Sequence, residues 1–342
     1  MTQTFILGGY TKRDNKGIHQ VEFDAKEGAF SDPSLISELN GPTFVALSKT
    51  KDLLFAIHKE NDQGGIVSFK KNDQGTWDKL ASGFGDNGSG CHVSYRESSQ
   101  TIYVSNYHAG VIDVFKLDGE ELNVIQTVEH SGSSIHENQD SSHVHYADFN
   151  DSQNLLFVCD LGTDFVTTYE IAEDGTLAPS SEIKLTPGTG PRHLVLHPTE
   201  PYAYIIGELA NTTTVVSLDA EGKMAAVETQ LNIPEEHVEK SAGAAIRITN
   251  DGRFLYVSTR FHNVLTVFEI SEDGGALTKI QEIDTNGEIP RDFNIDETEK
   301  YVLVAHQDTD HISVFDRNAE TGQLTFIQNN TLAPECVCIA SA

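Results

Sequence analysis

Short stretches of alternating hydrophobic and polar residues recur along the whole chain, separated by turns rich in Gly, Asp, Asn and Pro. Alternation with a period of two is typical of β-strands that bury one face. Helical spacing is nearly absent, and only residues 234–241 (PEEHVEKS) could form a single turn. The pattern therefore predicts an all-β protein.

One segment type recurs, with complete copies that begin at residues 42, 90, 143, 191, 243 and 290. Each copy has a short strand, a turn, a second strand with a large apolar residue at its centre, a polar loop and a third strand. The central residues of the second strands are Phe55, Tyr103, Phe157, Tyr204, Tyr256 and Leu303, which lie 48, 54, 47, 52 and 47 residues apart. A four-stranded propeller blade has about 50 residues, so 342 residues provide about seven blades.

Only six copies are complete, so the seventh blade has to be shared between the two ends of the chain. Residues 334–340 (PECVCIA) resemble a first strand with no second strand after it, while residues 4–10 and 17–23 supply a second and a third strand. A stack of β-sandwiches would not require the last repeat to stop where the first begins. We therefore expect residues 1–342 to form a single domain, a seven-bladed β-propeller with four-stranded blades that is closed by the shared blade.

The charge of the chain narrows the range of partners. Lys and Arg number 23 against 52 Asp and Glu, which gives a net charge of -29. Such a surface repels phosphate backbones and anionic lipid, so we expect no nucleic-acid partner and no membrane partner. No apolar run approaches the roughly 20 residues of a membrane helix, and the first residues lack a signal-peptide pattern. The sequence thus predicts a cytoplasmic protein.

Candidate chemistry gathers where the repeats converge. In a propeller, the loops into each first strand and out of each second strand open onto one face of the central channel. Four of the eight arginines of this acidic chain fall at these positions. The candidates are Arg192, Arg247, Arg260, Arg291, Glu208, Asp160, His92, His143, His145, His193 and His306. Because a guanidinium group can hold carboxylate or phosphate with two hydrogen bonds, they indicate a small-anion site, although such residues can also form salt bridges between blades.

A metal site is the main alternative for the histidines. His143 and His145 form an H-x-H pair that could ligate a metal ion together with Asp160 or Glu208. The neighbouring arginines would repel a cation, so we expect neither a metal ion nor a cofactor. The chain has no G-x-S-x-G motif, and a serine-hydrolase mechanism therefore has no support.

Several of these segments resemble the propeller-type 6-phosphogluconolactonase family, which is similar in turn to the fungal carboxymuconate-lactonising enzymes. The matching segments are 143–145 (HVH), 155–162 (LLFVCDLG), 190–193 (GPRH), 207–209 (GEL), 245–248 (AIRI), 251–256 (DGRFLY) and 290–293 (PRDF). The resemblance implies a seven-bladed fold and a site that handles a lactone. Carried over by motif, it implies catalytic roles for His145 (or His143), Arg192, Glu208 and Arg247.

The first functional hypothesis is a lactonase that hydrolyses a small anionic sugar-acid lactone such as 6-phosphogluconolactone. Arg192 and Arg247, supported by Arg260 or Arg291, would hold the anionic group, and Glu208 or His145 would act as general base. The remaining candidates would contact the substrate. One alternative is a muconate-type lactonising cycloisomerase. Another is a non-catalytic propeller that binds a protein or peptide on the same face.

Overall fold

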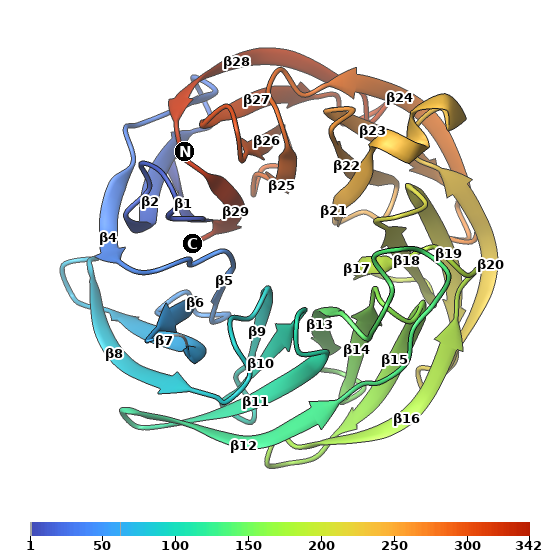
Figure 1. Cartoon of the computed structure of the whole chain (residues 1–342). Helices are drawn as coiled ribbons and strands as arrows, with labels where there is room; N and C mark the ends of the chain where they lie inside the picture. Colours follow the sequence, from blue (N-terminus) through green and yellow to red (C-terminus); the bar gives the residue numbers. More distant parts are fainter. Residues whose placement is uncertain (1, 62) are drawn as a thin grey trace.

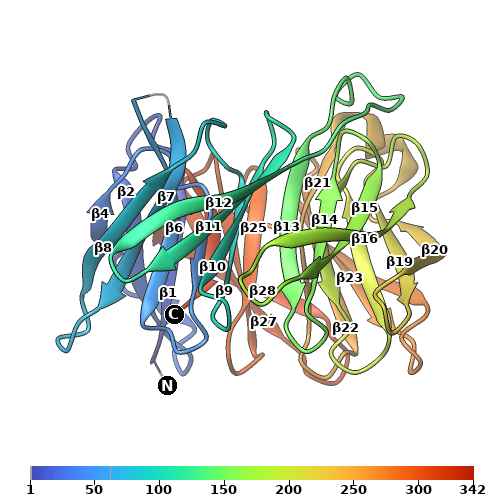
Figure 2. The same cartoon turned by 90° about the horizontal axis from the view of Figure 1, so that it is seen from below.

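The structure of the chain is a computed structural model, which describes residues 2–61 and 63–342. Seven antiparallel sheets stand around a central channel, each with its first strand innermost (Figure 1). Seen from the side, the strands run between two faces from which the connecting loops project (Figure 2). The predicted all-β, seven-bladed propeller with four-stranded blades is confirmed.

The strands of the first three complete blades follow one another from the channel outward. Blade one has β5 (Val45–Leu47), β6 (Leu53–Glu60), β7 (Gln63–Lys71) and β8 (Trp77–Phe84). Blade two has β9 (His92–Arg96), β10 (Thr101–Asn106), β11 (Val111–Asp118) and β12 (Glu121–Glu129). Blade three has β13 (Val144–Asn150), β14 (Leu155–Asp160), β15 (Phe165–Ile171) and β16 (Leu177–Lys184).

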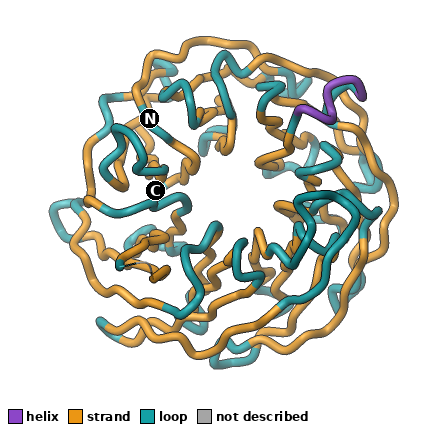
Figure 3. Tube along the Cα trace, in the orientation of Figure 1, coloured by secondary structure: helices purple, strands orange, loops and turns teal. Residues whose placement is uncertain are grey.

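The next three blades follow the same order. Blade four has β17 (Pro191–Leu196), β18 (Tyr202–Gly207), β19 (Thr212–Leu218) and β20 (Met224–Leu231). Blade five has β21 (Ala242–Ile248), β22 (Phe254–Arg260), β23 (Val264–Ile270) and β24 (Leu277–Asp284). Blade six has β25 (Pro290–Ile295), β26 (Tyr301–His306), β27 (His311–Arg317) and β28 (Leu324–Leu332). A short 3₁₀ helix, η1 (Glu235–Lys240), occupies the predicted turn before β21 (Figure 3).

The seventh blade joins the two ends of the chain. The C-terminal strand β29 (Cys336–Ser341) is its inner strand and pairs with β1 (Thr2–Gly9), which pairs with β2 (Gly17–Asp24). The outer positions are taken by β3 (Ala29–Phe30) and β4 (Ser34–Glu38), both of which pair with β2. The Glu335 carboxylate accepts the backbone N–H groups of Lys12 at 2.9 Å and Arg13 at 2.8 Å. These charge-assisted bonds add a second connection between the terminal segments.

The repeat markers explain how neighbouring blades are joined. Tyr103, Tyr204 and Tyr256 are fully buried at the centres of their second strands. Each hydroxyl donates to a carbonyl in an outer hairpin of the next blade, namely that of Gly175, Gly274 or Gly322. A buried phenol needs such a partner, so in these three repeats the marker residue supplies both apolar packing and a directed inter-blade bond.

β-bulges in the inner strands bring specific side chains to one end of the channel. The pairing register shifts between Val144 and Tyr146 in β13, between Pro191 and His193 in β17, and between Pro290 and Asp292 in β25. The extra residues at these bulges are His145, Arg192 and Arg291. A bulge commonly redirects a side chain next to a functional site, and the cavity described below contains all three.

Removing residues 334–342 should prevent correct folding, because it leaves β1 unpaired and exposes the apolar edges of blades one and six. We expect the truncated chain to be insoluble or to lack a cooperative thermal transition. Soluble yield and a thermal melt, each compared with the full-length protein, measure the effect. A soluble truncated protein with an unchanged melting temperature would contradict the shared blade as the element that closes the ring.

Candidate active site

The central channel contains two cavities that share Phe44, His193 and Asp292 in their linings. We call the cavity on the face formed by the loops after the second strands the funnel cavity, and the other the distal cavity. The funnel cavity has a volume of about 370 Å³ and the distal cavity about 520 Å³. The funnel cavity includes Thr43, Cys91, Tyr107, His145, Arg192, Glu208 and Arg291 in its lining. It therefore lies on the predicted face.

Glu208 holds two arginines at this site. Its Oε2 atom lies 2.9 Å from Arg192 Nε and 2.8 Å from Arg260 Nη2. Both arginines also donate to backbone carbonyls of blade five, Arg192 to Ala244 at 2.6 Å and Arg260 to Gly243 at 3.2 Å. Burial alone would raise the pKa of Glu208, but the charges of Arg260 and Arg192 outweigh it and lower that pKa. The group is thus a fixed carboxylate between two guanidinium groups.

Both arginines remain cations despite their burial. Their side chains are only 4% and 8% exposed. Burial, together with the charges of Arg291 and Arg260, lowers the pKa of Arg192 to about 9, which still leaves it protonated at neutral pH. The paired cations therefore exceed the charge of the single carboxylate that they share.

Arg291 adds a further positive charge. It lines the funnel cavity, and its guanidinium carbon lies 5.9 Å from the centre of the Tyr10 ring. Within residues 2–61 and 63–342, Arg291 forms neither a hydrogen bond nor an ion pair with a carboxylate. Lys59 also lines this cavity. A guanidinium group without a counter-ion beside an already cationic cluster is suited to capture an anion.

Two buried histidines of the funnel cavity, His145 and His193, are uncharged. Burial, reinforced by the charge of Arg192, lowers the pKa of His145 and of His193 well below the ordinary value. His193 Nε2 lies 3.3 Å from Arg192 Nη1, and the ring centres of His145 and His193 are 5.3 Å apart. Among the described residues, His145 Nδ1 has no hydrogen-bond partner. His145 therefore offers a neutral ring nitrogen next to the cationic cluster.

The structure resolves the choice within the H-x-H pair in geometric terms. His145 is 3% exposed and lines the funnel cavity. His143 instead stacks on the Tyr107 ring, with the ring centres 4.3 Å apart and the planes 5° apart. His143 thus supports the rim, whereas His145 faces the channel.

Arg247 lies elsewhere than expected. It lines the distal cavity, and its Nη2 lies 2.7 Å from Asp292 Oδ1. Strand β21 begins at Ala242, and Arg247 pairs opposite Tyr256 in the register. In blade four the residue opposite the marker tyrosine is Val195, three positions beyond Arg192. The expected grouping of Arg247 with Arg192 and Glu208 is therefore corrected.

His143 and Arg260, which contact residues of the rim, are not part of the funnel-cavity lining, and three further candidates also lie outside it. His92 lines the distal cavity. Asp160 is 1% exposed and accepts the Ser142 hydroxyl and the His143 N–H, both at 2.8 Å, so it anchors a loop. His306 is fully buried, with its Nδ1 3.2 Å from the His311 carbonyl oxygen. The expectation that these three side chains share a site with Glu208 is corrected, because His92 faces the distal cavity and the side chains of Asp160 and His306 are buried against neighbouring loop residues.

Some residues of the funnel cavity were not among the candidates. Tyr10, Lys59 and Tyr107 line it. Tyr10 and Tyr107 directly follow the second strands β1 and β10, and Lys59 is the last residue but one of β6. The rule that identified Glu208 also points to Tyr107, and it points to Tyr10 once it is applied to the shared blade. Burial raises the pKa of the Cys91 thiol to about 12, so this cysteine is not a ready nucleophile.

In residues 2–61 and 63–342, no group of three or more His, Cys, Asp and Glu side chains has an arrangement that could hold a metal ion. Within the same ranges, no helix has the length and apolar character required to cross a bilayer.

Comparison with known proteins identifies the family. Residues 4–341 match the family model described as lactonase, 7-bladed β-propeller. A 6-phosphogluconolactonase of Bacillus subtilis is 35% identical over 337 residues, covering 97% of this chain and 96% of its own. An uncharacterised Lactococcus lactis protein is 38% identical over 341 residues, 99% of each chain.

Solved structures share the fold. The crystal structure of a Lactobacillus plantarum protein superimposes with a TM-score of 0.96 at 36% identity, covering 100% of both chains. The periplasmic gluconolactonase of Pseudomonas aeruginosa shares the fold, with a TM-score of 0.92 at 23% identity over 100% of this chain and 99% of its own. The chain therefore belongs to the seven-bladed β-propeller lactonase family.

Proposed function

We propose that the protein is a carboxylic-ester hydrolase that opens a small anionic sugar-acid lactone, with 6-phosphogluconolactone, hydrolysed to 6-phosphogluconate, as the substrate. The observation that carries the proposal is the excess of positive charge in the funnel cavity, where Arg291 has no carboxylate partner among the residues that the structure describes. The Bacillus subtilis relative is named for this activity. The reaction would place the protein in the pentose phosphate pathway, in the cytoplasm.

The cavity residues provide the groups that lactone hydrolysis needs. Arg291 and Lys59 attract the anionic group of the substrate, and Arg192 is positioned to donate to the oxyanion that forms when water attacks the lactone carbonyl. The ring C–O bond then breaks, and the departing alkoxide takes up a proton. Glu208 and His145 are the unprotonated groups that could accept the proton of the attacking water.

The size of the funnel cavity favours a small-molecule substrate over a protein or peptide partner. A partly enclosed space of about 370 Å³ with buried charges suits a small ligand. A lactonising cycloisomerase could use the same groups to form a lactone from an unsaturated diacid, with one of them acting as an acid that protonates a carbon atom of the substrate. An unsaturated diacid is therefore assayed beside the lactones by its absorbance, and a loss of this absorbance would report cycloisomerisation.

The proposed activity is tested with a panel of lactones in a pH-stat, which measures the acid released. We expect anionic sugar lactones to be hydrolysed with a higher kcat/KM than neutral lactones of the same size, because the cationic cavity binds the former selectively. A chelator should leave the rates unchanged. The proposal fails if neutral lactones are preferred, if only the diacid reacts, or if chelation abolishes an activity that a divalent ion restores.

Substitutions in the funnel cavity test the assigned residues. Arg192→Lys keeps the charge but loses the planar donor geometry, and we expect kcat to fall by about a hundredfold or more. Glu208→Gln removes a candidate base and should lower kcat while leaving KM nearly unchanged. The kcat of His145→Gln is measured in the same way. The variant with the larger fall in kcat identifies which of the two groups accepts the proton of the attacking water.

The matched control is Arg253→Lys, at a residue that is 51% exposed in the loop between β21 and β22. Its activity should equal that of the unmodified protein, and thermal melts should show that all the variants are folded. If Arg192→Lys and Glu208→Gln both retain full activity on the best lactone, these residues only connect blades four and five, and the site lies elsewhere.

A further inference from the structure

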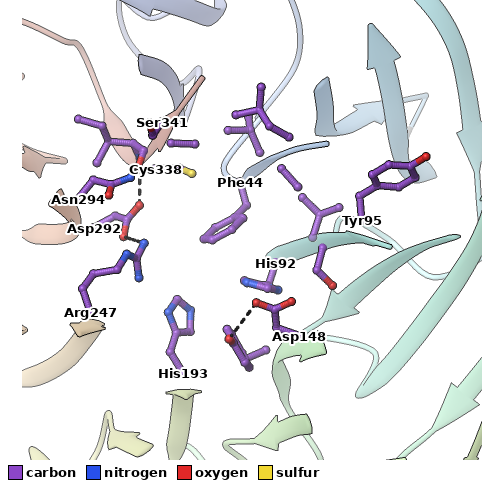
Figure 4. A pocket seen from close by; sticks show the side chains of 18 of the residues that line it. Phe44, His92, Tyr95, Asp148, His193, Arg247, Asp292, Asn294, Cys338 and Ser341 are labelled. Atoms are coloured by element: carbon purple, nitrogen blue, oxygen red, sulfur yellow. Dashed lines mark hydrogen bonds and ion pairs between the residues drawn. The ribbon is translucent and has the colours of Figure 1, made fainter. Parts of the chain in front are cut away.

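The distal cavity is built from one equivalent position of every blade. The residue that pairs opposite the centre of each second strand lines it, and these residues are Ala46, Ser94, Asp148, Val195, Arg247, Asn294 and Ala340. The cavity opens on the face of the loops between first and second strands, where Ser48 and Lys49 contribute to its lining. In Figure 4, Arg247 and Asp148 lie on different sides of it, with His193 and His92 between them.

Both hydrogen-bond donors and hydrogen-bond acceptors line the distal cavity. Arg247 donates to Asp292 at 2.7 Å and to the Ile246 carbonyl at 2.9 Å, which leaves other N–H groups of its guanidinium unused. Asn294 donates through Nδ2 to the Ile339 carbonyl at 3.0 Å, so its Oδ1 stays available as an acceptor. Asp148 accepts the backbone N–H of Phe149 at 2.9 Å, and its other oxygen is 3.3 Å from the Tyr146 hydroxyl.

A buried nitrogen strengthens the case for a ligand. His92 is 4% exposed and belongs to the lining of the distal cavity. Its Nδ1 has no hydrogen-bond partner among the described residues. Burial and the nearby charge of Arg247 lower the pKa of His92 to about 3, so the ring is neutral and can either accept or donate a hydrogen bond.

The charges of the distal cavity do not favour an ion. The carboxylate of Asp292 balances Arg247, and burial raises the pKa of Asp148 to about 6, which leaves the cavity close to neutral or slightly negative. At its mouth, Lys49 pairs with Asp151 and Lys51 pairs with Glu297. Anions meet two carboxyl groups here, and cations meet a guanidinium group. This is the opposite of the funnel cavity, where positive charge is in excess.

Flat apolar surfaces complete the lining, from the rings of Phe44, Tyr95, Tyr146 and Phe149. We propose that the distal cavity is a second binding site, for an uncharged polyol of monosaccharide size. The hydroxyl groups of such a molecule would donate to Asp148 and Asn294 and accept from Arg247, while its C–H faces pack on the aromatic rings. A volume of about 520 Å³ is sufficient for a single sugar ring. The proposal does not depend on the reaction in the funnel cavity.

The test is a binding panel on the full-length protein, measured by saturation-transfer NMR and by calorimetric titration. The probes are D-glucose, D-galactose, D-mannose and myo-inositol, compared with D-gluconate and D-glucosamine as charged analogues. We expect at least one neutral probe to bind more tightly than both charged analogues. No binding of any neutral probe at millimolar concentration, or tighter binding of a charged analogue, would overturn the proposal.

Two variants locate the bound probe. Asp148→Asn removes a charged acceptor and should weaken binding of the neutral sugar about tenfold or more, and Ala340→Leu should weaken it by filling the cavity. The matched control is Asp118→Asn, at an exposed position near the end of β11, which should bind as the unmodified protein does. Thermal melts show which variants are folded, and Ala340→Leu provides the test if Asp148→Asn is not. Undiminished binding in a folded cavity variant contradicts the proposed site.

A competition experiment separates the two ends of the channel. Inorganic phosphate should occupy the cationic funnel cavity, so we expect it to leave the affinity for the neutral sugar unchanged. Displacement of the sugar by phosphate would place both ligands in one site and would overturn the proposal of a distinct distal site.

Discussion

Seven inner strands pack around one axis, so the height of a residue along its strand decides which end of the channel it faces. This constraint determines the chemistry of the whole molecule. The bulge residues His145, Arg192 and Arg291 line one cavity, and the residues three positions further along, Asp148, Val195 and Asn294, line the other. Between them, Phe44, His193 and Asp292 belong to the linings of both cavities. Closure of the ring by β29 and β1 keeps these levels aligned.

The two levels differ in charge because buried ions need partners. At the funnel level, Glu208 is shared by Arg192 and Arg260, and Arg291 lacks a carboxylate partner within the described residues. At the distal level, Arg247 forms an ion pair with Asp292. A buried cation without its own counter-ion is costly unless a ligand supplies the negative charge. The funnel cavity is therefore the end of the channel suited to an anion.

The repeat made much of this architecture predictable from the sequence. Aromatic residues at a spacing of about 50 positions indicated the blades, and the incomplete last repeat indicated the shared one. The same alignment led to Arg192, Glu208, His145 and Arg291, because each begins a first strand or follows a second strand. The chemistry of a site is thus accessible from sequence where the position within the repeat is unambiguous.

Other candidates were placed less well. Arg247 is the fifth residue of the copy that begins at residue 243, whereas Arg192 is the second residue of the copy that begins at residue 191. The repeat alignment therefore already places Arg247 level with Val195 and not with Arg192, and it was the carry-over by motif that grouped the two arginines. The remaining misplacements depend on local side-chain direction. Asp160 and His306 end their second strands as Glu208 follows its own, but their side chains turn into loop and blade contacts. Bulges and side-chain directions of this kind arise from tertiary packing and leave no pattern in the sequence.

The most direct test of the account is a crystal structure of the protein with 6-phosphogluconate, the acid that the proposed reaction would produce. The account predicts that an anionic group of this molecule lies in the funnel cavity, within hydrogen-bond distance of Arg291 and Arg192. An acid bound beside Arg247 in the distal cavity, or a funnel cavity that stays empty at saturating concentration, would contradict it.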